Sequence, residues 1–256
     1  MIHRQDRDSV AVLRLEHGKA NAVDSELFDQ LGERLDELRR SPASALVLTG
    51  TGGIFSAGVN LFKVVEGGGS YLAEFLPKLS QGIARLLALP QPVVAAINGH
   101  AIAGGCVLAC ACDRRMMADG NARIGLTELL VGVPFPAAAL ETVRALLPAH
   151  RVQDLVYRGR TLAPGEALAA GLVDELAKPE GLLERACAVA RELGEIPGEA
   201  FALTKRHLRR PLLERIERYG PEVDPEVLRQ WSQPETREAI RAFMERTVHS
   251  GAPGRQ

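Results

Sequence analysis

The 256-residue chain is poor in aromatic residues, which make up 4% of it and include one tryptophan. Its core must therefore rest on leucine, valine, isoleucine and alanine, and the length fits one domain with an appendage better than two full domains. Neither sign of charge is in excess, because the formal net charge is -1. The chain as a whole attracts neither nucleic acid nor an anionic membrane, so we expect no nucleic-acid partner.

Cysteine is also scarce, and three of the four cysteines crowd one apolar stretch at Cys106, Cys110 and Cys112. Their spacing does not suit a secreted disulfide framework and offers no second ligand pair for zinc, so core packing is the better interpretation and no metal is expected. The first residues lack the apolar run of a signal peptide, and the last ones carry no peroxisomal or prenylation signal. We expect a cytoplasmic protein.

A charge-free run from residue 93 to residue 112 is long enough to suggest a membrane span. However, Asn98-Gly99-His100 and Gly104-Gly105 interrupt it, and alanine and glycine dilute its hydrophobicity. A buried strand that leads into a buried helix of small residues explains this run better, and we expect no membrane association.

Hydrophobic periodicity predicts an α/β core followed by helices alone. Strands are expected at residues 10–15, 45–49, 93–97 and 115–118. Helices are expected at residues 24–40, 72–87, 104–112, 136–147, 149–157, 164–170, 182–193, 198–209 and 234–247. Ser232 to Glu235 has a capping-box pattern that would open the last helix. We expect a core over residues 1–195 and a C-terminal helical trimerisation or lid region over residues 196–256.

Three segments stand out as candidates for chemistry: Gly53 to Leu61 (GIFSAGVNL), Ala95 to Cys106 (AAINGHAIAGGC) and Ile124 to Glu128 (IGLTE). Taken alone, each has a simpler interpretation, as a tight turn, a close-packed helix start and a surface glutamate. Together with NAVD at residues 21–24 and TLAPGEALAAGLVDEL at residues 161–176, they resemble the crotonase (enoyl-CoA hydratase/isomerase) family, in its order and over nearly the whole chain.

The resemblance implies an α/β fold built as a superhelix of β-β-α turns, with C-terminal helices that assemble trimers or dimers of trimers. It also implies an acyl-CoA thioester as substrate, so coenzyme A arrives with the substrate and no separate cofactor is needed. An oligomer contact could involve Trp231, Ile240, Phe243 and Met244, although core packing within one chain explains these side chains too.

The family's chemistry removes a weakly acidic α proton from an acyl thioester and leaves an enolate oxygen. By resemblance, the backbone N–H groups of Val59 and Gly104 form the oxyanion hole for this oxygen, and such a donor typically lowers the barrier by about 3 kcal/mol. Gly104 also opens a helix, whose free N–H groups favour negative charge. The resemblance assigns contacts with the substrate and its coenzyme A to Lys19, Ala20, Ala22, Ala57, Gly58, Asn60, Leu61 and Gly105.

Glu128 matches the position at which the family places a catalytic glutamate. Its apolar neighbours Ile124, Leu126, Leu129 and Leu130 should desolvate the carboxyl group and raise its pKa, which suits a base that must also return the proton.

Val107 is an informative departure, because hydratases of the family carry a second glutamate at this position and use both carboxylates on water. The mitochondrial-type delta-3,delta-2-enoyl-CoA isomerases lack it and keep only the one that matches Glu128. We therefore expect an isomerase. Another reaction of the family (hydration, hydrolysis or decarboxylation) and a non-catalytic acyl-CoA-binding paralogue stay open.

Several other polar residues have less specific interpretations. Lys63 lies one residue later than the lysine with which many relatives grip the coenzyme A phosphates, so Lys205 or residues 206–210 could substitute, although a solvated basic face is preferred. Ser56 and His100 are interpreted as turn residues. The glycines at residues 67–69 predict a flexible loop that would let residues 60–71 act as a lid.

Overall fold

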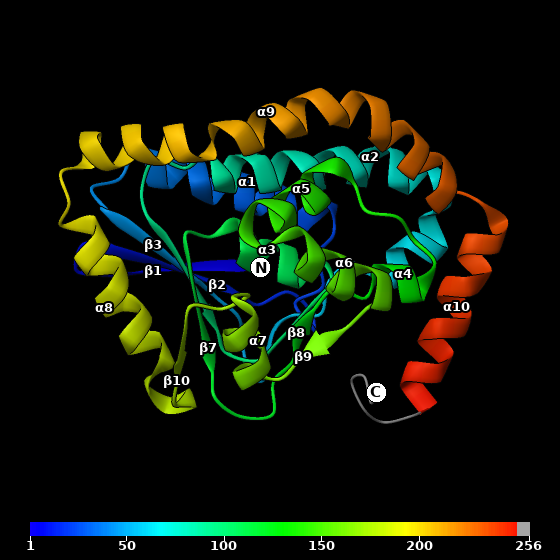
Figure 1. The fold of residues 1–256 in the computed structure, drawn as a ribbon, viewed down its shortest axis with the longest axis horizontal. Helices are drawn as coiled ribbons and strands as arrows, with labels where there is room; N and C mark the ends of the chain where they lie inside the picture. Colours follow the sequence, from blue (N-terminus) through cyan, green and yellow to red (C-terminus); the bar gives the residue numbers. More distant parts are fainter. Residues whose placement is uncertain (250–256) are drawn as a thin grey trace.

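The structure is a computed structural model that describes residues 1–249, with side chains described through Thr247 (Figure 1). Its strands are β1 (Ile2–Arg7), β2 (Val10–Leu15), β3 (Ala45–Thr49), β4 (Ile54–Ser56), β5 (Val93–Ile97), β6 (His100–Ile102), β7 (Arg114–Ala118), β8 (Ile124–Gly125), β9 (Thr161–Leu162) and β10 (Glu175–Ala177). Its α-helices are α1 (Ser25–Arg39), α2 (Leu61–Leu87), α3 (Gly104–Ala111), α4 (Glu128–Val131), α5 (Ala137–Leu146), α6 (Ala149–Arg158), α7 (Pro164–Ala170), α8 (Leu182–Gly194), α9 (Gly198–Trp231) and α10 (Pro234–His249).

The strands form two sheets, in the orders β1-β2-β3-β5-β7-β10 and β4-β6-β8-β9. Three successive turns of the chain each give one strand to each sheet and then a helix: β3-β4-α2, β5-β6-α3 and β7-β8-α4. All pairings among these six strands are parallel. The carboxyl ends of β4, β6 and β8 therefore meet at one edge of the small sheet. This is the β-β-α superhelix that the resemblance predicted.

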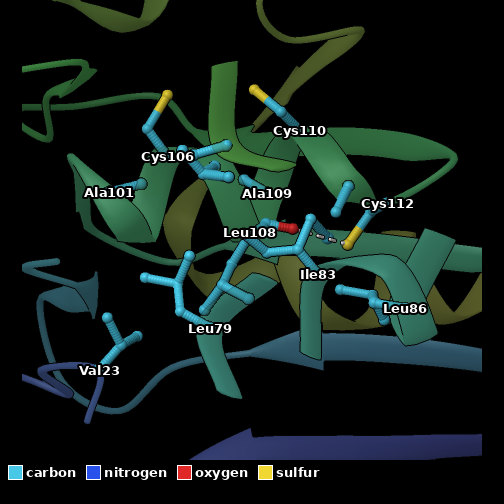
Figure 2. Close-up of a cluster of buried hydrophobic side chains, with 14 of the residues drawn as sticks. Val23, Leu79, Ile83, Leu86, Ala101, Cys106, Leu108, Ala109, Cys110 and Cys112 are labelled. Atoms are coloured by element: carbon cyan, nitrogen blue, oxygen red, sulfur yellow. Dashed lines mark hydrogen bonds between the residues drawn. The ribbon is translucent and has the colours of Figure 1, made fainter. Parts of the chain in front are cut away.

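The buried strands read as nearly continuous apolar runs because both faces of the large sheet are covered. One face packs on α8 through residues such as Val47, Val94 and Ala190. The other faces the main core, to which α1, α2 and α3 contribute. Within that core, Leu108 of α3 meets Leu79 and Ile83 of α2 (Figure 2). The four cysteines are free and buried, which confirms core packing.

The predicted strands and most of the predicted helices are confirmed, and the differences have local causes. The prediction missed β1, an edge strand whose side chains are largely polar, and the strands of only two or three residues: β4, β6, β8, β9 and β10. No open loop forms at residues 67–69, but the predicted interruption is present: Gly68 (φ 56°) is non-helical and makes a kink that joins two helical segments of α2 and packs against the Arg237 guanidinium. Ser232, which was expected to begin the capping box of the last helix, instead bonds back to α9, because its hydroxyl donates to Leu228 O at 2.7 Å.

Helix α9 was predicted to end at Arg209 but continues to Trp231 past three prolines. Packing against α2 and α5 holds this segment (Figure 1). One link is Asp224, whose carboxylate accepts from Ala137 N at 2.8 Å. Trp231 and Ile240 are buried within the chain, which confirms core packing for these side chains. Within residues 1–249, no helix is long and apolar enough to cross a membrane.

Candidate active site

A cavity of about 470 Å³ lies between the edge of the small sheet and two helices, the end of α9 and α10. It is the place where the loops after β4, β6 and β8 converge. Its wall is lined by Ala57, Val59, Leu61, His100, Ile102, Ala103, Arg123, Thr127, Glu128, Val131, Val133, Thr161, Trp231, Phe243, Arg246 and Thr247.

The first candidate oxyanion-hole amide belongs to Val59, which forms a parallel bridge with Val23. Val23 N donates to Gly58 O at 2.8 Å, and Asn60 N donates to Val23 O at 2.9 Å. Since successive N–H groups of an extended chain point to opposite sides, the Val59 N–H is directed away from Val23. It donates to no acceptor within the described part of the chain. It is therefore free for a ligand.

The second candidate amide belongs to Gly104, the first residue of α3, whose N–H has no partner within the helix. Ala103 precedes it with φ 51° and ψ -121°, a backbone conformation that alanine rarely adopts, and no side chain caps the helix. Such strain is typical of functional sites. The turn leaves Gly104 close to the Val59 segment, since a Cβ on Gly104 would lie 3.7 Å from Val59 N, while its neighbour Ala103 lines the cavity.

Two glycines allow this close approach. A Cβ on Gly58 would lie 2.7 Å from Ile102 O and 3.2 Å from Gly104 N, and its φ of 86° also favours glycine. A Cβ on Gly105 would lie 2.2 Å from Ser56 O. Helix α3 can therefore start against the end of β4 only with glycine at residue 105. The structure brings the Val59 and Gly104 segments together, as the oxyanion-hole prediction requires.

Glu128 opens α4 after β8 and lines the same cavity. Its side chain is buried, and its Oε2 atom has no hydrogen-bond partner. Burial raises the pKa of this carboxyl group to about 8, against the opposing effect of the backbone N–H groups of Glu128 and Thr127. Among the described residues that line the cavity, Glu128 is the only acid, so it is the group placed to accept and return a proton at neutral to mildly alkaline pH.

A buried carboxylate, Asp24, fixes the start of α2 and the turn before it. Asp24 is fully buried; it caps α1 by accepting from Leu27 N at 3.0 Å and pairs with Lys63 and His17 at 2.8 Å each. Burial alone would raise its pKa, but these partners outweigh it and lower the pKa. Asn60 caps α2 by accepting from Lys63 N at 3.3 Å. Lys63 therefore serves the fold around the site.

The predicted coenzyme A segments lie side by side, since Ala57 N donates to Ala20 O at 3.0 Å. Ala57 and Leu61 line the cavity, whereas the structure does not bring Lys19, Ala20 or Ala22 into its wall. Gly58, Asn60, Gly104 and Gly105 are likewise not among the residues that line the cavity. Val107 is buried in the core and also lies outside the cavity wall.

Two polar residues of the wall were underestimated from the sequence. His100 Nδ1 accepts from Arg123 N at 3.1 Å, so it satisfies a backbone group as expected, but it does so from the first position of β6 rather than from a turn, and the residue also lines the cavity. Arg123 was missed, because a lone arginine between strands carries no local signal. Ser56 is fully buried and donates to Asn21 O at 2.7 Å, which confirms a turn hydroxyl.

The interpretation of Lys205 as part of a solvated basic face is wrong. Its side chain is 6% exposed, pairs with Asp113 and donates to Gln91 O at 2.9 Å. Arg209 joins the same carboxylate at 3.2 Å, so this cluster ties α9 to the start of β5 and the end of α3. Within residues 1–249, no cluster of histidine, cysteine, aspartate and glutamate side chains is arranged to hold a metal ion.

Known proteins resemble this chain in sequence and in fold. The enoyl-CoA hydratase/isomerase family model matches residues 5–250. A putative enoyl-CoA hydratase of Thermus thermophilus is 36% identical over 208 residues, which cover 79% of this chain and 81% of the relative.

Among solved structures, a Mycobacterium tuberculosis probable enoyl-CoA hydratase, EchA3, is 33% identical with a TM-score of 0.83, covering 88% of this chain and 95% of that one. The human mitochondrial delta3-delta2-enoyl-CoA isomerase is 25% identical with a TM-score of 0.91, covering 98% and 99%. The chain belongs to the enoyl-CoA hydratase/isomerase family.

Proposed function

We propose that this protein is a delta-3,delta-2-enoyl-CoA isomerase. The observation that carries the proposal is Glu128, the one acid among the described residues of the cavity wall, which is buried with its Oε2 atom unpaired and shares that wall with Val59, whose backbone amide is free. Its ionised carboxylate takes the proton from the α carbon of a 3-enoyl thioester, and the C=C bond shifts into conjugation as the same proton is returned to the γ carbon. The Val59 and Gly104 amides stabilise the enolate oxygen formed in between.

The names of relatives point both ways, since the Thermus thermophilus relative is called a putative hydratase, whereas the human neighbour and one structure of the Mycobacterium tuberculosis neighbour are called isomerases. Hydration needs a second group to position and split water. The family's hydratases carry a glutamate at the position of Val107, and here that side chain is apolar and buried outside the cavity wall. This difference favours isomerisation over hydration.

The protonation of Glu128 sets the expected pH dependence. With its pKa at about 8, the unliganded site holds the protonated acid at neutral pH. Because the base form is required, kcat/KM for isomerisation should rise as the pH increases through about 8 and then level off. A rate that is flat between pH 6 and pH 9 would contradict this assignment.

The central experiment assays the purified protein with 3-hexenoyl-CoA and follows the ultraviolet absorbance of the conjugated product. Glu128→Gln should lower turnover by about 10²–10⁴-fold, the usual contribution of a general base. Glu184→Gln, an exposed change on α8, is the matched control and should have no effect. Undiminished turnover in Glu128→Gln would remove this residue from the mechanism.

Folding cannot explain such a loss, because the stability effect has the opposite sign. The buried acid holds its proton up to about pH 8, whereas the unfolded chain releases it near pH 4.5, so ionisation costs stability as the pH rises between these values. Glu128→Gln should therefore be at least as stable as the parent protein at pH 8, which urea denaturation measures.

Two further assays separate the rival activities. A hydratase would remove the conjugated absorbance of 2-hexenoyl-CoA, and a non-catalytic paralogue would bind the thioester without exchanging its α proton for solvent deuterium. The homotrimer or dimer of trimers stays a prediction from the resemblance, which light scattering on the purified protein checks.

A further inference from the structure

The small sheet carries a polar cluster on the cavity wall, away from the oxyanion hole. His100 is the first residue of β6, Arg123 immediately precedes β8, and Thr161 begins β9. All three line the cavity, and the backbone pairs Gly125 with Thr161 across β8 and β9. Proton transfer by Glu128 uses none of them. The cluster therefore needs a separate explanation.

The Arg123 guanidinium is held in place but carries an unused charge. Its Nη2 donates to Thr161 O at 2.7 Å and its Nε to Thr161 Oγ1 at 3.3 Å. These acceptors are neutral, and no carboxylate within the described chain lies in ion-pair distance of it. By contrast, the neighbouring Arg158 and Arg160 both pair with Asp154. A half-buried, oriented guanidinium without an acid partner is suited to an anionic ligand.

His100 adds a neutral donor beside this charge. Because Nδ1 accepts the Arg123 N–H, the ring proton resides on Nε2, which is then available to the cavity. Burial and the Arg123 charge both lower the pKa of His100, so the ring stays neutral. Arg246 of α10 lines the same cavity, whose one acid is the mostly protonated Glu128. The net charge of the wall is therefore positive at neutral pH.

We propose that Arg123, with His100 beside it, binds an anionic oxygen group of the substrate. The inference rests on the proposed acyl-CoA function. His100 lies four residues before Gly104 along β6 and the turn after it, so the two are at most about 13 Å apart at about 3.3 Å per residue. An anionic group within that distance of the thioester is either a phosphate of coenzyme A or a carboxylate at the far end of the acyl chain.

Calorimetric titration of unreactive saturated thioesters tests this without requiring turnover. The ligands are decanoyl-CoA, decanoyl-pantetheine, which lacks the nucleotide phosphates, and sebacoyl-CoA, which adds a terminal carboxylate. The variants are Arg123→Met and the control Arg158→Met, whose arginine is exposed and lies outside the cavity wall.

If the anion is a coenzyme A phosphate, Arg123→Met weakens decanoyl-CoA binding by about 10- to 100-fold and leaves decanoyl-pantetheine unchanged. If it is an acyl carboxylate, the parent protein prefers sebacoyl-CoA over decanoyl-CoA, and Arg123→Met abolishes that preference. Arg158→Met changes neither. Equal affinities of Arg123→Met and parent for all three ligands would overturn the inference.

A variant that keeps the charge guards against a trivial loss of fold. Arg123→Lys should retain most of the affinity, and affinity of the parent protein for the favoured ligand should fall with added salt more steeply than that of Arg123→Met. Failure of the parent protein to bind any thioester would instead contradict the acyl-CoA function itself, so the two failures are distinguishable.

Discussion

The two helix starts that supply the candidate amides, those of α2 and α3, are stabilised in opposite ways. At α2, side-chain contacts stabilise the helix start: Asn60 caps the helix, and Lys63 pairs with the buried Asp24. At α3 no side chain caps the helix, and the backbone is held by close packing around Gly105 and a strained Ala103. One candidate amide thus depends on electrostatics and the other on steric fit.

This difference predicts which changes should disturb each half of the candidate oxyanion hole. The α2 half should respond to acid and to the loss of a charge, because its contacts are ionic. The α3 half should not depend on pH. It should not tolerate one added methyl group, because the methyl would overlap a backbone carbonyl that close packing holds in place. The next three predictions test that division.

The largest effect is expected for Gly105→Ala. The new Cβ would lie 2.2 Å from Ser56 O and 2.8 Å from Ser56 Cβ, so α3 must shift away from β4. We expect a loss of about 3 kcal/mol or more in the free energy of unfolding, measured by urea denaturation. The neighbouring Gly104→Ala is the matched control, since its Cβ would come no closer than 3.2 Å to the Val23 side chain. Equal losses in the two variants would contradict the steric account.

A smaller loss, about 2 kcal/mol, is expected for Asp24→Asn, because it leaves Lys63 and His17 without their carboxylate. The pKa of Asp24 is below its ordinary value of 3.8, so its stabilising contribution is fully present above that pH and is lost as the pH falls through the folded-state pKa. The stability difference between parent and variant should therefore be constant from pH 5 to pH 7 and shrink in stronger acid.

The exposed pair of Asp29 with Lys78 provides the control for that prediction. Asp29→Asn should lower the free energy of unfolding by less than about 1 kcal/mol, because exposed ion pairs usually contribute little to stability. A similar cost for both variants would mean that the start of α2 gains nothing special from its buried carboxylate.

The smallest effect has the opposite sign. Ala103→Gly removes the strain at φ 51° and should raise the free energy of unfolding by about 0.5–1 kcal/mol, after the entropy cost of glycine. Ala163→Gly, at φ -70°, has no strain to relieve and should destabilise the protein slightly. Thermal unfolding of the two variants compares them, and a lower midpoint for Ala103→Gly would refute the strain at this turn.

The sequence predicted much of the fold because its strands are short apolar runs and its glycines lie where the backbone crowds. The helix from Ser25 to Arg39 was found from its apolar spacing. Glu128 was found from an apolar neighbourhood together with a family motif. These signals are local, so they can be read along the chain.

What the sequence did not reveal depends on contacts between distant segments. The pairing of Lys205 with Asp113 and that of Lys63 with Asp24 join residues 92 and 39 positions apart, and no periodicity announces them. Likewise, α9 continues past Pro211 and packs on α5, whereas propensity alone predicts a stop at this proline. The cluster of Arg123 with His100 and Thr161 exists only because β6, β8 and β9 lie side by side in the folded sheet.

The position of the indole at the end of α9 has a practical consequence. Trp231 is the only tryptophan of the chain, it donates to Pro134 O at 2.9 Å, and it forms part of the cavity wall. The protein thus contains a natural fluorophore in the cavity wall, where a bound ligand would change the surroundings of the indole. Its emission should therefore report occupancy of the cavity without a label and without background from a second indole.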